Sequence, residues 1–300
     1  MDTARDNKTY GAERPFPALT PAQRYHLDIY GYVVIENTLS KDETGRLLEA
    51  MQRLKRDFLA TEDPAGATVR GCGLSAYRPN HMHFKHVLET DAAVFDYLTH
   101  PRLVGMAQEI VGGTVRLEES EAIINSRDPD DTGDKPFSYG WHTGTRPAYG
   151  TYTENGLYHC PFVKTLTNLT ELGPDDGGTA VIAGSHKVKC GQREIIACAE
   201  DDPSLIHQVV APAGSTLLFG EALVHATGPI RGNRERAIII GGYTPPMYRA
   251  WPGQEPSPEF IEQTPGPLRP LISASDSWDW TQRFRTLDMP AQPWQGANAR

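Results

Sequence analysis

Histidine, threonine and arginine side chains recur in four short segments of the second half of the chain. In order they are "WHTG" (141–144), "LGPDDGGTAVIAGSHK" (172–187), "LVHATG" (223–228) and "RERAIIIGGYTP" (234–245). Neutral imidazoles on two facing strands can hold a first-row transition metal and leave coordination positions open. An arginine guanidinium donates two parallel hydrogen bonds to a carboxylate. These residue types favour chemistry at a metal ion with a carboxylate-bearing ligand, although histidines in such segments also occur as packing or surface residues.

The part of the chain before about residue 115 is expected to be largely helical. Residues 39–60 begin with a capping box formed by Ser40 and Glu43. Apolar residues then recur at helical spacing and give the segment one apolar face. A second helical stretch over 91–113 should break near His100 and Pro101 and end at the paired glycines. A short β-branched strand, "YGYVVIENTL", precedes both helical stretches.

From about residue 115 the sequence changes to short β-rich segments separated by Gly, Pro and Asp turns. Segments such as "TVRLEESEAIINS", "PFVKTLTNLTEL" and "RAIIIGGYTP" favour a sandwich or barrel over a parallel βαβ sheet. The motifs GxGxxG, GxxxxGK[ST] and GxSxG are missing, so nucleotide-binding and serine-hydrolase functions lack their signatures. A chain of 300 residues can form one such domain with added helices.

The composition and charge of the chain limit the kinds of partner that we expect the protein to bind. The net charge of −9 argues against general nucleic-acid binding, which needs clustered Lys and Arg. No apolar run approaches the roughly 18 residues of a membrane span. The polar N-terminus lacks the apolar core of a secretory signal, and the four cysteines show no CxxC spacing. We therefore expect a cytoplasmic protein with reduced thiols, no membrane association and a small-molecule substrate, and the oligomeric state stays open.

The four segments, in this order, resemble the phytanoyl-CoA dioxygenase (PhyH) family of iron(II)/2-oxoglutarate oxygenases, and "DIYGYVVIENTLSKDE" resembles the opening of that family. The resemblance covers roughly residues 20–245. It implies a mainly β fold with α-helices, in which N-terminal helices pack on a double-stranded β-helix (jelly roll). The expected organisation is a flexible N-terminus at 1–19, one catalytic domain at 20–245 and a Pro/Trp-rich extension packed on the core at 246–300. Within the domain, 20–114 is the helical layer and 115–245 the jelly-roll core.

The same resemblance implies the site residues and the cofactors, which are Fe(2+), 2-oxoglutarate and O2. His142 and His225 match the two iron-binding histidines. Arg236, at the eleventh position after His225, matches the arginine that pairs with the far carboxylate of 2-oxoglutarate, and Thr227 matches a hydroxyl on the same carboxylate. Further positions that resemble cosubstrate-pocket residues are Thr165 and Lys85.

One position departs from the family. The iron-binding pattern is His-X-Asp, but residue 144 is glycine. Iron halogenases related to these oxygenases have glycine or alanine here and bind halide in the vacated position. Loss of the carboxylate removes a negative charge that a small anion would restore. The resemblance therefore implies a halogenase that transfers chlorine, with chloride as cosubstrate, to an unactivated C–H bond of a small metabolite.

Three other interpretations remain open. A hydroxylase or desaturase could complete the iron shell with water or with another carboxylate, such as Glu154 or Glu221. A catalytically inactive jelly roll could bind a small ligand without iron, or the motif could be coincidental. Loops beside the mouth of such a fold often cover the substrate, so Arg146 and Tyr149 are predicted to contact it. The nearby histidines of "RPNHMHFKH" are expected to line a pocket or lie on the surface rather than bind metal.

Overall fold

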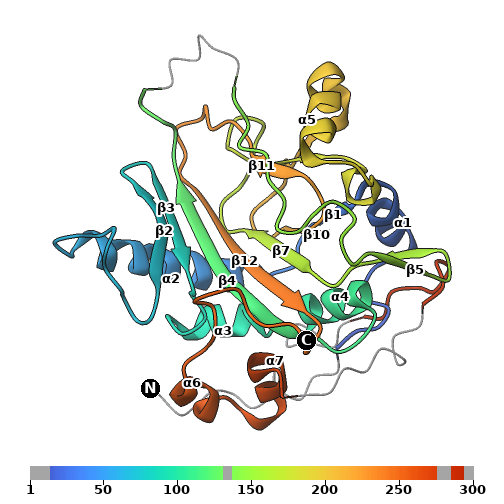
Figure 1. Cartoon of the computed structure of the whole chain (residues 1–300). Coiled ribbons are helices and arrows are strands. Elements are labelled where there is room, and N and C mark those ends of the chain that lie inside the picture. The colour runs from blue at the N-terminus through green and yellow to red at the C-terminus, as the bar shows by residue number, and fades with distance from the viewer. Residues whose placement is uncertain (1–13, 131–136, 276–284, 294–300) are drawn as a thin grey trace.

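Two antiparallel sheets face each other at the centre of the molecule (Figure 1). The computed structural model describes residues 14–130, 137–275 and 285–293. The major sheet has the strand order β1-β10-β7-β12-β4-β3-β2, and the minor sheet has the order β11-β8-β9. Every pairing is antiparallel, as in a jelly roll.

The major sheet contains strands from both halves of the chain: β1 (Tyr32–Ile35), β2 (Gly73–Arg78), β3 (His81–Lys85), β4 (Arg116–Asn125), β7 (Val163–Asn168), β10 (Thr216–Gly220) and β12 (Arg236–Thr244). The minor sheet and a separate hairpin contain shorter strands: β8 (Thr179–Ile182), β9 (Ile206–Gln208), β11 (His225–Thr227), and β5 (Tyr152–Glu154) with β6 (Leu157–His159).

Helices cover the outer face of the major sheet (Figure 1). The N-terminal helices are α1 (Pro21–Tyr30), α2 (Lys41–Leu59), α3 (Ala92–Leu98) and α4 (Pro101–Val111). Later helices are α5 (Gln192–Asp201), α6 (Pro258–Gln263) and α7 (Arg269–Ser273), with short 3-10 turns at Ser185–Lys187, Pro203–Leu205 and Gly266–Leu268. None of the described helices is long and apolar enough to cross a membrane.

The helix boundaries follow local signals in the sequence. Ser40 and Glu43 form the expected capping box at the start of α2. Pro101 occupies the first turn of α4, where its missing N–H costs nothing, and therefore separates α3 from α4. Gly112 ends α4 in the left-handed conformation (φ +81°). These three predictions are confirmed.

Side-chain alternation assigns the two faces of the major sheet. On β12, Ala237 and Ile239 pack on the helices, whereas Ile238 and Ile240 point toward the minor sheet. On β10, Leu218 faces the helices, and its neighbours Leu217 and Phe219 face inward. Successive residues of a strand point to opposite faces. The inner face therefore carries a second cluster of buried hydrophobic side chains, between the two sheets. It also carries, at its open end, the polar side chains described below.

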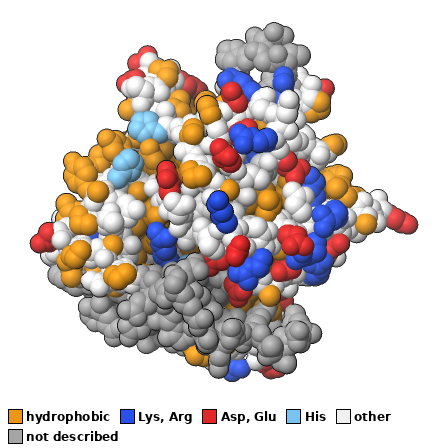
Figure 2. Space-filling model, turned by 180° about the vertical axis from the view of Figure 1, so that it is seen from behind, with side chains coloured by type: hydrophobic (Ala, Val, Ile, Leu, Met, Phe, Trp, Pro, Cys, Tyr) orange, Lys and Arg blue, Asp and Glu red, His pale blue; other side chains and the backbone are white. Residues whose placement is uncertain are grey.

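The hairpin β2–β3 extends the major sheet within the part of the chain expected to form a helical layer. The Pro/Trp-rich extension lies on the core over its described residues, with α7 in contact with β4. On the face opposite to the view of Figure 1, Lys and Arg side chains are interspersed with Asp and Glu, and hydrophobic side chains gather near histidine side chains on one side (Figure 2).

Candidate active site

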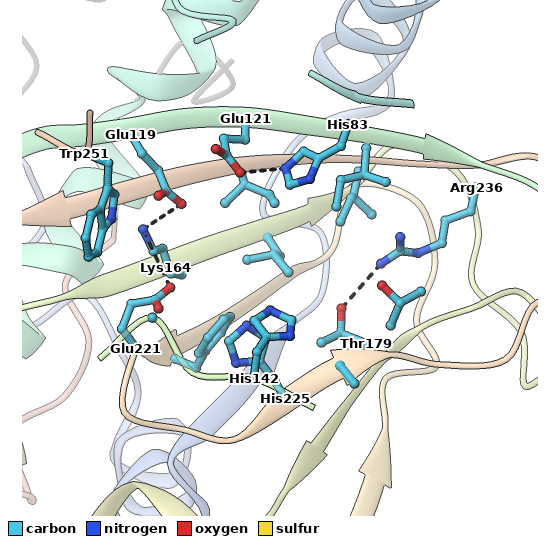
Figure 3. Close-up of a pocket in the computed structure, with 18 residues that line it drawn as sticks. His83, Glu119, Glu121, His142, Lys164, Thr179, Glu221, His225, Arg236 and Trp251 are labelled. Carbon is cyan, nitrogen blue, oxygen red and sulfur yellow. Dashed lines mark hydrogen bonds and ion pairs between the residues drawn. The ribbon is translucent and has the colours of Figure 1, made fainter. Parts of the chain in front are cut away.

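His142 and His225 lie side by side on neighbouring backbone segments. Each donates its backbone N–H to the carbonyl of the other, at 2.9 and 3.0 Å, so residue 142 extends the minor sheet beside β11. Their ring centroids are 4.2 Å apart (Figure 3). The structure thus brings together the two histidines that the sequence places far apart.

Backbone carbonyls orient both imidazoles in the same way. His142 Nδ1 lies 2.9 Å from the Gly140 carbonyl oxygen, and His225 Nδ1 lies 2.9 Å from that of Leu223. Because a carbonyl only accepts, Nδ1 carries the proton in each ring and Nε2 keeps its lone pair. Burial lowers the pKa of His225 to about 3, so this ring is neutral at physiological pH. Two imidazoles oriented in this way fit a first-row metal.

The carboxylate of Glu221 lies where a side chain at position 144 would begin. A Cβ built on Gly144 would be 1.4 Å from Glu221 Oε2 and 2.4 Å from its Cδ. Within the described residues, no three His, Cys, Asp or Glu side chains already form a complete set of metal ligands. The expectation of an open space beside Gly144 is corrected, because this space holds a glutamate.

Lys164, on β7, is surrounded by three carboxylates. Its Nζ lies 2.8 Å from Glu118, 2.6 Å from Glu119 and 3.6 Å from Glu221 (Figure 3). Burial alone would lower the pKa of Lys164, but these carboxylates raise it above its usual value, so the lysine is charged. The lysine therefore links the wall of the cavity to the glutamate beside Gly144.

Arg236, at the start of β12, is a buried cation without a carboxylate partner among the described residues. Its guanidinium donates to Asn125 Oδ1 at 3.3 Å and to Thr179 Oγ1 at 3.5 Å, and its Nε has no partner. Burial lowers its pKa to about 10, which still leaves it charged at neutral pH. Since a buried unpaired charge is costly, this position fits an anionic ligand. Thr227 pairs with Thr179 across β11 and β8, and both line the same cavity.

These groups share one cavity of about 370 Å³ between the two sheets. The histidines and Arg236 line one part of it. The other part is lined by charged and aromatic side chains, namely His83, Glu119, Glu121, Lys164 and Trp251 (Figure 3). His83 is one of the histidines of "RPNHMHFKH", and it lines this cavity as expected. Its Nε2 lies 2.7 Å from Glu121 Oε2. The volume and lining suit a small polar molecule beside the histidine pair.

Thr165 and Lys85, which were predicted to lie near the cosubstrate, do not line the cavity. Thr165 points to the helix side of β7, where its Oγ1 contacts Tyr97 and donates to the Gly241 carbonyl. Lys164, its neighbour, faces the cavity instead, which corrects the expectation for Thr165. Lys85 does not line the cavity. Its Nζ lies beside Gly253, 3.2 Å from the position that a Cβ on this glycine would have.

The loop residues predicted to contact substrate also lie outside the cavity lining. Arg146 and Tyr149 follow the histidine segment, and Tyr149 is half exposed. Their contact with substrate stays a prediction.

Sequence reasoning missed several cavity residues. Trp251 lies in the C-terminal extension, and its backbone N–H donates to the Glu118 carbonyl at 3.2 Å. Asn125, which accepts from Arg236, belongs to a strand with no motif around it, and Thr179 lies within the segment 172–187 without a pattern that singles it out. The acidic run "EESE" beside an apolar strand was a usable signal for Glu119 and Glu121, since buried charges occur with partners.

The sequence matches a known protein family. The phytanoyl-CoA dioxygenase (PhyH) family matches residues 27–238, and the chain belongs to this family of 2-oxoglutarate-dependent enzymes. This result confirms the resemblance.

Curated relatives include ectoine dioxygenases. That of Streptomyces coelicolor is 28% identical over 168 residues, which cover 55% of this chain and 50% of the relative. That of Bordetella bronchiseptica is 25% identical over 199 residues, covering 66% of this chain and 58% of the relative. The chain thus spans only half to three-fifths of the length of these relatives.

Solved structures with the same fold include HygX from Streptomyces hygroscopicus with nickel and 2-oxoglutarate bound. It has a TM-score of 0.61 at 20% identity and covers 78% of this chain and 90% of that one. The 2-oxoglutarate-dependent epimerase SnoN from nogalamycin biosynthesis has a TM-score of 0.55 at 18% identity, covering 76% and 84%. These similarities confirm the jelly-roll fold.

Proposed function

We propose that the protein is an iron(II)/2-oxoglutarate-dependent oxygenase that oxidises a C–H bond of a small molecule. The observation that carries this proposal is that one cavity holds two imidazoles whose Nδ1 atoms face backbone carbonyls and a buried arginine with no carboxylate partner among the described residues. Membership of the PhyH family and the ectoine dioxygenase relatives support it.

The residues divide into two groups by role. His142 and His225 would hold the metal through Nε2, while the backbone carbonyls at Nδ1 keep both rings in the metal-binding tautomer. Arg236 would bind the far carboxylate of 2-oxoglutarate, with Thr227 as a second donor. When bound, iron and 2-oxoglutarate supply the oxidising power for the reaction of O2 with the substrate, and the keto acid is decarboxylated to succinate.

The remaining wall of the cavity is the proposed substrate side. Glu119, Glu121 and His83 present hydrogen-bonding groups there, and Trp251 presents an aromatic face. The names of the relatives refer to ectoine, and one HygX structure contains hygromycin B, so small polar molecules are the substrate class that the comparisons support. Hydroxylation is the reaction that we favour, because the relatives are dioxygenases.

Halogenation is the second candidate, and the glycine at position 144 is the observation that favours it. Chloride would then have to occupy the space beside Gly144 that the Glu221 carboxylate fills in this structure. The two candidates differ in one measurable property, the dependence of the product on chloride. An identical product with and without chloride would remove halogenation and leave the oxygenase.

An anaerobic titration tests the shared part of the proposal without the substrate. Iron(II) added with 2-oxoglutarate should produce the visible metal-to-ligand absorption band of the chelated keto acid. His225→Ala should remove the band, whereas His26→Ala, on α1 away from the cavity, should retain it. A wild-type protein that gives no band and binds neither component would instead indicate an inactive jelly roll for a small ligand.

A further inference from the structure

Position 144 has glycine for a reason other than backbone conformation. Gly144 does not have the positive φ that favours glycine, so an alanine or aspartate could adopt its backbone angles. What prevents a side chain there is Glu221, whose Oε2 would lie 1.4 Å from the added Cβ. The glycine and the glutamate therefore form a complementary pair.

The backbone holds this pair together. Glu221 follows β10 directly, and its carbonyl accepts the N–H of Thr145 at 3.4 Å, while its own N–H donates to the Phe162 carbonyl at 3.0 Å. These hydrogen bonds fix Glu221 next to the segment that carries His142. Glu221 also precedes His225 by only four residues. Its side chain enters the cavity beside the two imidazoles (Figure 3).

We propose that Glu221 is the third protein ligand of the metal and takes the place of the aspartate that the family pattern has at position 144. This inference rests on the proposed function. In a His-X-Asp pattern the carboxylate would project from Cβ of residue 144, and the Glu221 carboxylate occupies the position of that Cβ, which it reaches from the segment after β10. The proposal therefore gives residue 221 the role that the family pattern gives to residue 144.

Lys164 directs the carboxylate. Its Nζ lies 3.6 Å from Oε1 of Glu221, whereas Oε2 is the oxygen nearest Gly144. Glu118 and Glu119 anchor the lysine, so its position does not depend on Glu221 alone. Partners that hold one oxygen of a ligating carboxylate are typical of metal sites. The described residues do not form a closed set of three metal ligands, so the Glu221 side chain would have to change its conformation when the metal binds.

A halide and this carboxylate exclude each other. Both would need the space beside Gly144, and both supply one negative charge to the metal. A glutamate ligand therefore assigns the chain to oxygenation rather than halogenation, although its HxG sequence matches the halogenases.

Metal affinity tests the assignment independently of turnover. Cobalt(II) would be titrated anaerobically into the metal-free full chain and followed by calorimetry and visible absorption. Glu221→Gln keeps the size of the side chain but removes a charged ligand, and should weaken cobalt binding by at least about 30-fold, since even outer partners of ligands are typically worth 10–100-fold. Glu49→Gln is the matched control and should bind cobalt like the wild type, because Glu49 is an exposed residue of α2 outside the cavity lining.

A rescue variant keeps the test decisive if Glu221→Gln folds poorly. Gly144→Asp alone should bind cobalt weakly, because its side chain collides with Glu221. Combined with Glu221→Ala, the same substitution should recover most of the wild-type affinity, because one carboxylate again occupies the space.

The outcomes separate this inference from the proposed function. Cobalt binding by Glu221→Gln equal to the wild type, with binding lost in His225→Ala, would overturn the role of Glu221 and leave the oxygenase proposal intact. A chloride-dependent change in the wild-type cobalt spectrum would also overturn it, because halide would then take the position. A wild type that binds no cobalt at all would remove both proposals.

Discussion

Arg236 and Asn125 are direct partners across β12 and β4, and the arginine guanidinium donates to the asparagine side chain at 3.3 Å. This contact fixes a buried cation at the end of the cavity without neutralising its charge. The strand pairing thus leaves the guanidinium available to a ligand.

Replacing Arg236 should weaken 2-oxoglutarate binding more than it weakens metal binding. Arg236→Leu removes a charge-assisted contact worth about 1.5–3 kcal/mol, which corresponds to a loss of roughly 10- to 150-fold in affinity. A titration of 2-oxoglutarate at saturating iron(II) measures the effect. Arg234→Leu is the matched control, since Arg234 is largely exposed and pairs with Asp176 outside the cavity lining. Equal loss in both variants would show that Arg236 acts only through general charge.

Two neighbouring residues of β7 should respond differently to substitution. Thr165→Val removes hydrogen bonds to Gly241 and Tyr97 on the helix side and should lower the free energy of unfolding by about 0.5–1.5 kcal/mol. Its affinity for 2-oxoglutarate should stay unchanged. Lys164→Met leaves three carboxylates without their cation and should cost about 3–5 kcal/mol. Denaturant unfolding of both variants checks this contrast, which a cosubstrate defect in Thr165→Val would contradict.

The stability of the protein should decrease in mild acid, in part because of His159. Burial, with Arg24 nearby, lowers the pKa of His159 from 6.5 to about 4. Between these pH values the unfolded chain takes up a proton that the folded protein does not, so its contribution to stability is complete above pH 6.5 and is lost as the pH falls toward 4. The slope from this group is at most about 1.4 kcal/mol per pH unit.

The variant His159→Gln isolates this contribution. Glutamine does not titrate, so the difference in unfolding free energy between wild type and variant should change across pH 6.5–4 and be constant above that range. Other buried histidines affect both proteins equally and cancel in the difference. A difference that is independent of pH would show that His159 does not titrate as described.

The elements set by local signals could be predicted from the sequence. Ser40, Pro101 and Gly112 act on the backbone within one helical turn, and the helix ends lie where these residues place them. The histidine pair and Arg236 were identified because a family pattern specifies their order. The hairpin at 73–85 was not foreseen, since its strands are short and largely polar.

Two features of the site depend on information that a single segment does not contain. Strand β7 is buried on both faces, so no alternation of polar and apolar residues shows that Lys164 rather than Thr165 faces the cavity. The sequence alone does not distinguish Glu221 from Glu154 as a carboxylate that could complete the iron shell. Only the pairing of its backbone with residue 145 shows that its side chain enters the space of Gly144.

Trp251 and Gln254 lie beyond residue 238, where the family match ends, yet Trp251 lines the cavity and Gln254 donates to Glu121 at 2.9 Å. Part of the cavity wall therefore comes from residues that lie beyond the family match. A change confined to this segment would alter the cavity beside Trp251 and leave His142, His225 and Arg236 in place.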